Sequence, residues 1–201
     1  MYKHVVVISA HPDDLEMGCS GTLMKMMSDG TKVTSIVMVG DVPHSDYLDK
    51  AASIMKLSPI GFNPIIFSNT SDRFSVDHKT IAKLEQAVDF SEVDLIITHW
   101  KEDAHQDHRA CYDIANSLRR HQPMDVWYMS SYPYNLKYSS FNPNTYVDIT
   151  DHYIQKMAVM KAYQNISANW HRGVQAHDSW RGTFIDSVYA EAFMSDTRIV
   201  L

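Results

Sequence analysis

Cysteine is scarce in this sequence, and long apolar runs are absent. Its two cysteines, Cys19 and Cys111, lack the closely spaced partners that build the disulfide framework of a small secreted domain. No stretch approaches the about 20 apolar residues that a membrane-spanning helix needs. The chain begins with a strand-like run and has no basic segment followed by an apolar one, so we expect no secretory signal. Together these absences predict reduced thiols, no membrane span and a cytoplasmic location.

Positive charge is in deficit as well. Lys and Arg total 18 against 24 Asp and Glu, which gives a formal net charge of -6. Binding to nucleic acid or to an anionic membrane through overall charge requires a basic excess, so we expect neither partner. The segment "GCSG" at 18–21 has neither the glycine spacing of a dinucleotide fingerprint nor the lysine of a phosphate-binding loop. This argues against a nucleotide cofactor.

What the sequence does contain is an alternation of strands and helices. Apolar residues make up 45% of the 201 residues, enough for the core of one domain. We expect strands over 4–9, 32–40, 64–68, 93–100 and 125–130, and helices over 21–30, 46–57, 78–88, 108–121 and 151–163. Uninterrupted apolar strands separated by helices are typical of a parallel sheet covered on both faces. The sequence therefore predicts a single α/β domain, 1–201, with a mostly parallel sheet in three layers and a C-terminal elaboration.

Charged and imidazole side chains gather directly after two of these strands. The first strand, "HVVVIS", runs into "AHPDD", and the fourth ends in "THWKEDAHQDH". In open α/β sheets, ligands bind beyond the carboxyl ends of the strands, so we expect both segments at one edge. They contain His11, Asp13, Asp14, His99, Asp103, His105, Asp107 and His108. Carboxylates crowded together repel one another unless a cation lies among them, and imidazole with carboxylate suits a divalent transition metal.

Three of these residues fit a zinc site. His11 and Asp14 follow the first strand and His108 follows the fourth, which supplies two imidazoles and one carboxylate. A catalytic zinc site has three protein ligands and keeps its fourth position for water. A simpler interpretation is that Asp13 and Asp14 cap the following helix and favour its dipole.

The remaining residues of the two segments suggest catalytic roles. Asp13 adjoins a candidate ligand, is not needed as one, and is placed to act as general base. His105 would stabilise a developing oxyanion or protonate a leaving group, and Asp107 would hold an imidazole in one tautomer. A histidine such as His99 is more often structural than functional.

At these residues the sequence resembles the LmbE-like, or PIG-L-type, zinc-dependent N-deacetylases. The family's first signature is similar to "AHPDDLEMGCSGTL" and its second to "HQDH" at 105–108. Segments 142–163 and 189–193, the latter "YAEAF", resemble further family motifs. The resemblance implies a Rossmann-like α/β fold and hydrolysis of an N-acetyl group from an amino sugar.

The resemblance also implies roles for individual residues. It makes His11, Asp14 and His108 the ligands of one Zn²⁺, although other divalent transition metals suit the same donors. It makes Asp13 the general base. His105 becomes the positively charged partner of the tetrahedral intermediate, with Asp107 behind it. The implied partner is a small N-acetylated substrate, and a homo-oligomer is compatible with the family.

The sequence departs from the family after the second strand. Where the family has a Gly-Glu pair followed by an arginine that holds the substrate, this chain has Asp41 and, near the arginine position, His44. Histidine cannot reproduce the donor fork of a guanidinium, so the substrate stays open. An amidase for a non-sugar N-acyl compound and a sugar-binding module without turnover are the alternatives. The residues that could line the pocket instead are the segment 127–146, Trp170, His171, His177 and Arg181.

Overall fold

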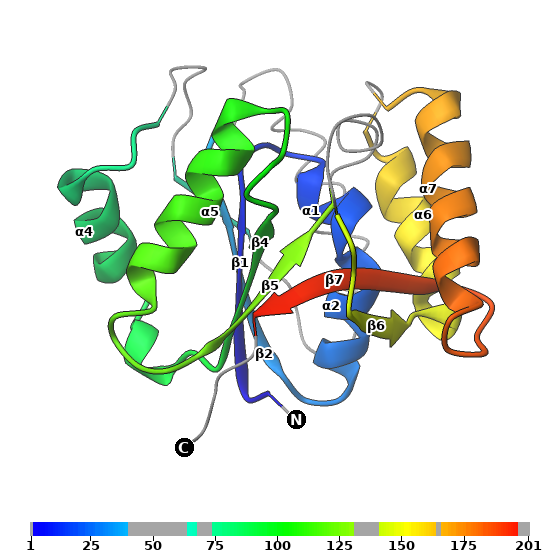
Figure 1. Ribbon diagram of the computed structural model, residues 1–201, viewed down its shortest axis with the longest axis horizontal. Helices are drawn as coiled ribbons and strands as arrows, with labels where there is room; N and C mark the ends of the chain where they lie inside the picture. Colours follow the sequence, from blue (N-terminus) through cyan, green and yellow to red (C-terminus); the bar gives the residue numbers. More distant parts are fainter. Residues whose placement is uncertain (1, 40–63, 68–73, 131–140, 164–165, 197–201) are drawn as a thin grey trace.

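The computed structural model describes residues 2–39, 64–67, 74–130, 141–163 and 166–196. Within them the chain forms a seven-stranded sheet in the order β3-β2-β1-β4-β5-β7-β6 (Figure 1). The strands are β1 (His4–Ser9), β2 (Lys32–Val37), β3 (Pro64–Ile66), β4 (Leu95–His99), β5 (Asp125–Met129), β6 (Thr145–Asp148) and β7 (Ala190–Asp196). The first five run parallel, whereas β7 is antiparallel to both of its neighbours, β5 and β6.

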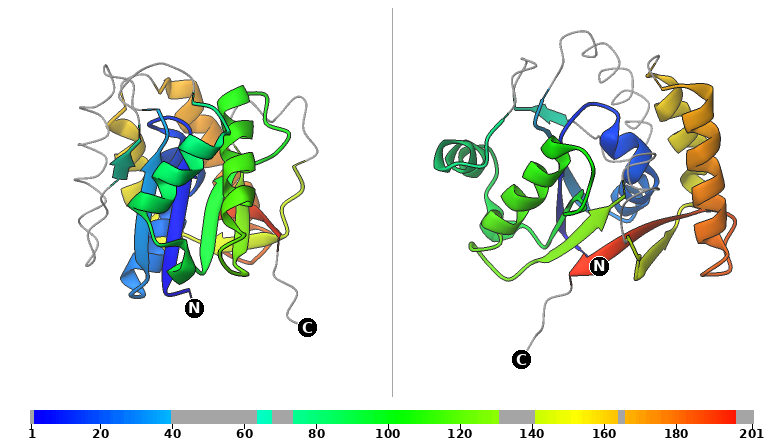
Figure 2. Two further views of the ribbon diagram at one scale, coloured as in Figure 1. Left: turned by 90° about the vertical axis from the view of Figure 1, so that its left-hand side faces the viewer. Right: turned by 45° about the horizontal axis from the view of Figure 1, so that its top comes forward.

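Helices cover both faces of the sheet (Figures 1 and 2). They are α1 (Asp14–Gly18), α2 (Ser20–Ser28), α4 (His78–Ala87), α5 (Gln106–Leu118), α6 (Tyr153–Lys161) and α7 (Ala168–Gly182), with the 3-10 helices η2 (Phe90–Glu92) and η3 (Thr150–His152). One face carries α4 and α5, and the other carries α1, α2, α6 and α7. The predicted α/β fold with a mostly parallel sheet in three layers is therefore confirmed. No helix in the described ranges combines the length and the apolar character that a membrane crossing requires.

β1, an interior strand of the sheet, shows why the sequence pattern was informative. β1 lies between β2 and β4, and all six of its residues are buried. Val5 and Val7 belong to the core under α1, α2, α6 and α7, while Val6 and Ile8 belong to the core under α4 and α5. Successive side chains of a strand point to opposite faces. A strand covered on both faces is therefore apolar throughout.

Most of the predicted elements are present with small shifts at their ends. The helix expected over 108–121 begins earlier, at Gln106, because His105 is its N-cap. There the backbone N–H of Asp107 donates to His105 Nδ1 over 3.2 Å. The helix expected over 46–57 lies outside the described residues.

The C-terminal elements α7, β6 and β7 were not predicted. The buried positions of α7 are Val174, Asp178, Arg181 and Gly182, so the helix lacks the apolar stripe that marks an amphipathic helix in a sequence. Its start is capped by Ser167, whose side chain accepts from the N–H of Trp170.

Charged groups replace apolar ones in this part of the core. Lys156 Nζ lies 2.6 Å from Asp178 Oδ2 and 2.8 Å from Glu191 Oε1, and at most 2% of each of these three side chains is exposed. The Glu191 carboxylate also accepts from the backbone N–H groups of Gly21 and Thr22, in the first turn of α2. This network, formed by Lys156, Asp178 and Glu191, joins α2, α6, α7 and β7.

Candidate metal centre

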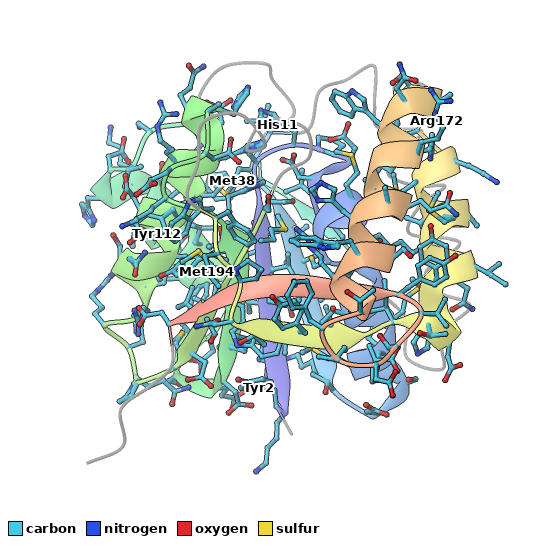
Figure 3. All side chains as sticks on the ribbon, turned by 45° about the vertical axis from the view of Figure 1, so that its right-hand side comes forward. Tyr2, His11, Met38, Tyr112, Arg172 and Met194 are labelled. Carbon is cyan, nitrogen blue, oxygen red and sulfur yellow. The ribbon has the colours of Figure 1, made fainter. Side chains whose placement is uncertain are left out.

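The two predicted motifs lie together at one edge of the sheet. β1 and β4 are parallel neighbours, so the segments that follow them emerge on the same side. α1 begins at Asp14, the last residue of the first segment, and α5 begins at Gln106, within the second. Figure 3 shows His11 at one end of β1, with Tyr2 at the other.

Asp14 is the centre of the cluster. Its side chain is buried, with Oδ1 3.3 Å from His108 Nε2 and Oδ2 3.5 Å from His11 Nδ1. Oδ2 also accepts from the backbone N–H of His11 over 2.8 Å. Burial acts to raise the pKa of Asp14, but the charges and hydrogen bonds of the neighbouring imidazoles hold it well below its ordinary value. The structure thus brings together the three predicted ligands.

His108 is held from behind by a second carboxylate. Its Nδ1 lies 3.0 Å from Oδ2 of the buried Asp103, which leaves Nε2 facing Asp14. Burial acts to lower the pKa of His108, but Asp14 and Asp103 outweigh it and raise the pKa to about 10. The position therefore stabilises a positive charge. A carboxylate that orients an imidazole in this way is a common arrangement behind metal ligands.

The donor set fits a transition metal ion. Ring nitrogens of His11, His105 and His108 lie within 4.8 Å of one another, and so do ligand atoms of Asp14, His99 and His108. Both groups contain His108 and consist of imidazole nitrogen and carboxylate oxygen, the ligands that zinc accepts. The described residues therefore contain a possible His/Asp metal site, and each of the two groups includes two members of the expected set His11, Asp14 and His108.

His99 was left without a role by the sequence, and its surroundings are structural. It is fully buried and stacks on His108, with ring centroids 3.9 Å apart. Its Nε2 accepts from the backbone N–H of Ala10 over 3.1 Å and lies 3.4 Å from Asp14 Oδ2. Burial and His108 lower the pKa of His99 to about 4, so the ring is neutral near pH 7. His99 packs against the ligand candidates and fixes the start of the first loop.

Asp107 and His105 lie on the outer side of the cluster. Asp107 Oδ2 is 3.0 Å from His11 Nε2 and 3.9 Å from His105 Nδ1. Asp107 is thus closer to the imidazole of His11 than to that of His105. A carboxylate at this distance can fix the tautomer of His11.

The hydrogen bond of His105 to the start of α5 indicates which ring nitrogen carries its proton. Because its Nδ1 accepts from the N–H of Asp107, the proton of the neutral ring belongs on Nε2. Burial, with the nearby His108 and His11, lowers the pKa of His105 below its ordinary value. The structure therefore favours a neutral His105 that donates through Nε2.

Asp13 occupies an unusual backbone position between the two ligand candidates of the first loop. It is the N-cap of α1, with φ 92° and ψ -25°, in the left-handed region. Asp13 is thus the N-cap residue by position, and its proposed role as a base stays a prediction. Its backbone N–H donates to Glu16 Oε2 over 3.1 Å.

Some of the further residues considered for the substrate pocket lie outside the described ranges, whereas His171 and His177 are half-buried on α7. Asp41 and His44 lie outside the described residues, as do residues 131–140. Trp170 packs against the core near the start of α7, and Figure 3 shows the neighbouring Arg172 at the same end of the molecule as His11. Arg181 lies in the last turn of that helix, 3.9 Å from Asp178, and is therefore part of the buried charged core and not of this edge.

Asp103, like His99, is a residue at this site to which the sequence assigns no function. Its position five residues before His108, in a loop leaving a strand, was visible in the sequence. The sequence did not show that Asp103 is buried or that it contacts His108 Nδ1. Asp103 Oδ1 also accepts from the backbone N–H of His105 over 2.8 Å, so one carboxylate orders both the ligand candidate and the loop before α5.

Known proteins resemble this chain in sequence and in fold. The uncharacterized deacetylase YaiS from Escherichia coli (strain K12) is 27% identical over 173 residues, which cover 81% of this chain and 91% of that protein. N,N'-diacetylchitobiose deacetylase from Pyrococcus horikoshii has a TM-score of 0.75 at 18% identity, over 96% of this chain and 84% of that one. The 4-carboxy-2-hydroxymuconate hydratase of Pseudomonas putida KT2440 has a TM-score of 0.79 at 16% identity, over 99% and 98%.

These structural likenesses, at under 25% identity, show a shared fold. The family is shown by the sequence itself, since the PIG-L model, described as GlcNAc-PI de-N-acetylase, matches residues 6–118, more than half of the chain. Both motifs of the candidate metal centre lie within that match. The chain belongs to the PIG-L, GlcNAc-PI de-N-acetylase family.

Proposed function

We propose that this protein is a zinc-dependent hydrolase that removes the N-acetyl group of an amino sugar or of an N-acetylglucosamine-containing metabolite. The observation that carries the proposal is the convergence of His11, Asp14 and His108, with Asp103 behind His108. Family membership supports amide hydrolysis as the reaction class. The proposed location is the cytoplasm, with which the buried, unbridged Cys19 and Cys111 are compatible.

In this proposal His11, Asp14 and His108 hold one zinc ion, and Asp103 and Asp107 orient the two imidazoles. When bound, zinc supplies Lewis-acid chemistry, which activates a water molecule and polarises an amide carbonyl.

Asp13 is the proposed general base. It takes a proton from the attacking water as the water oxygen bonds to the acetyl carbon. The carbon–nitrogen bond then breaks, and Asp13 returns the proton to the departing amine, which leaves acetate and a free amino group. His105 donates through Nε2–H to the oxyanion that develops on the substrate. This role suits a neutral His105. Its Nδ1 accepts from the backbone N–H of Asp107, so the ring proton is on Nε2 and can be donated to the substrate.

The first test combines elemental analysis with an acetate-release screen. The purified protein should contain about one zinc per chain. A panel of N-acetylated sugars, nucleotide sugars and simple N-acetyl amines, with added zinc, tests the substrate. Acetate release from sugars supports the proposal, and release from the simple amines alone would favour the non-sugar amidase. Zinc binding without any turnover would favour the sugar-binding module.

Two variants separate the base from the ligands. Asp13→Asn should retain zinc and lose on the order of 10²–10⁴ in kcat. His11→Ala should lose the zinc itself. Matched controls are Asp113→Asn on the exposed side of α5 and His121→Ala just after it, both of which should leave zinc content and rate unchanged. Normal turnover by the Asp13 variant would overturn the base assignment, and full zinc content in the His11 variant would overturn the ligand set.

A further inference from the structure

Asp13 holds a backbone conformation that its neighbours must maintain. Among the described residues, Asp13 and Asp186 are the two non-glycine residues with positive φ. An L-residue in the left-handed region is energetically unfavourable, and it persists where the surrounding structure fixes it. At Asp13 the conformation matters because the residue adjoins the candidate ligand Asp14.

The buried side chain of Glu16 contacts the backbone of Asp13. Its carboxylate is 2% exposed, and its Oε2 accepts from the backbone N–H of Asp13 over 3.1 Å. The other oxygen, Oε1, accepts from the hydroxyl of Tyr163 over 2.8 Å. Each carboxylate oxygen therefore has a specific donor, one on the strained residue and one on a distant part of the chain.

Tyr163 provides the rigid support. It follows α6, is 1% exposed, and belongs to the core beneath α1, α2, α6 and α7. A side chain packed in this way has little freedom to move, because protein interiors are close-packed. The line of contacts from Tyr163 through Glu16 to the N–H of Asp13 ties the first loop to the C-terminal half of the chain.

We propose that Glu16, anchored by Tyr163, is a positioning residue that holds the backbone of Asp13 in its left-handed conformation and so aims the Asp13 carboxylate at the reacting water. The inference rests on the proposed function, in which Asp13 is the general base. A buried capping interaction that only stabilised the short helix α1 would have the same hydrogen bonds. The two roles predict different results for a Glu16 variant that stays folded and binds metal: the positioning role predicts a lower kcat, and the capping role alone predicts an unchanged kcat.

Substitution at Glu16 tests the role directly. In Glu16→Gln the side-chain carbonyl oxygen still accepts from the Asp13 N–H. The new amide NH₂ can donate to the Tyr163 hydroxyl, which rotates to accept. We therefore expect kcat to stay within about threefold of wild type. Glu16→Ala removes the anchor, and kcat should fall about 10- to 100-fold, since small misplacements of a catalytic group have effects of that size. KM and zinc content should be unchanged in both variants.

Tyr163→Phe provides a second, milder perturbation. It removes one hydroxyl from the support of Glu16, and kcat should fall several-fold at unchanged KM and zinc content. The matched control is Tyr153→Phe on α6, because the buried hydroxyl of Tyr153 has no hydrogen-bond partner within the described part of the chain. If Glu16→Ala does not fold, Tyr163→Phe decides the question alone, and an unchanged kcat overturns the inference.

Amide hydrogen exchange gives a readout that does not depend on activity. In the metal-free protein the Asp13 amide should exchange faster in Glu16→Ala than in wild type, and at the wild-type rate in Glu16→Gln. Loss of zinc together with activity in Glu16→Ala, or a wild-type kcat in that variant, overturns the positioning role. If wild type is inactive on every substrate, or if Asp13→Asn is fully active, the proposed function itself fails. The two failures are therefore distinguishable.

Discussion

Replacement of Lys156 by methionine tests how much the buried ion pairs of Lys156 with Asp178 and Glu191 stabilise the fold. Lys156 is fully buried on α6 and contacts two carboxylates, those of Asp178 and Glu191. Burial acts to lower the pKa of Lys156, but the two carboxylates raise it above its ordinary value, so the ammonium group is stabilised in this environment. Methionine fills a similar volume and removes the charge. Two buried carboxylates then face each other without the cation between them.

The expected loss follows from the buried geometry. Removing one partner of a buried, hydrogen-bonded ion pair costs about 3–5 kcal/mol, mainly because the remaining charge is left uncompensated. In a chain of this size each kcal/mol lowers Tm by about 2–4 °C, so Lys156→Met should lower Tm by about 6–20 °C. The free energy of unfolding is measured by urea denaturation at pH 7, followed by circular dichroism.

Two further variants make the test specific. Lys161→Met changes an exposed lysine on the same helix and should alter the free energy of unfolding by less than about 0.5 kcal/mol. Lys156→Met combined with Asp178→Asn should recover about 1–3 kcal/mol relative to Lys156→Met, since the second change removes one of the stranded charges. A loss below about 1 kcal/mol in the single variant, or a double variant no more stable than Lys156→Met, would refute the reasoning.

Two other predictions concern pH and metal binding. Burial, with nearby cationic side chains, lowers the pKa of His177 to about 4. The unfolded chain, with a histidine pKa near 6.5, therefore binds more protons over the window from about 6.5 to 4, and the free energy of unfolding should fall as pH is lowered through it. His177→Gln should flatten that dependence in urea titrations, and an unchanged pH profile would contradict the assignment. Asp103→Asn weakens the support of His108 and should reduce zinc affinity about 10- to 100-fold in competition with a chelating dye; wild-type affinity would show that Asp103 does not orient this ligand.

The parallel half of the fold was predictable because its sequence pattern is simple. β1 and β4 are buried on both faces, so each contains a run of consecutive apolar residues, and the helices between the strands have their own period. The helices and strands of the C-terminal half could not be predicted from apolar periodicity, because charged residues occupy some of their buried positions. Asp178 and Arg181 in α7 and Glu191 in β7 are buried, and a pattern of apolar periodicity gives no sign of elements built in this way.

The candidate site was predictable in position and less so in its internal contacts. Strand ends that carry His11, Asp14 and His108 must meet wherever β1 and β4 are parallel neighbours. The partner of each imidazole depends on how the folded chain places the side chains, so it cannot be derived from their spacing in the sequence. The sequence could not reveal that Asp107 lies nearer to His11 than to His105.

The central claim is that His11, Asp14 and His108 bind one zinc ion while Asp13 stays off the metal. The most direct measurement is a crystal structure of the zinc-loaded protein, with anomalous diffraction recorded on both sides of the zinc absorption edge. The account predicts one zinc peak, with the two imidazole nitrogens at about 2.0–2.1 Å, the Asp14 oxygen at about 2.0–2.2 Å and no bond to Asp13. A zinc peak bound by other residues, a bond from Asp13 to the ion, or no peak at this edge of the sheet would contradict it.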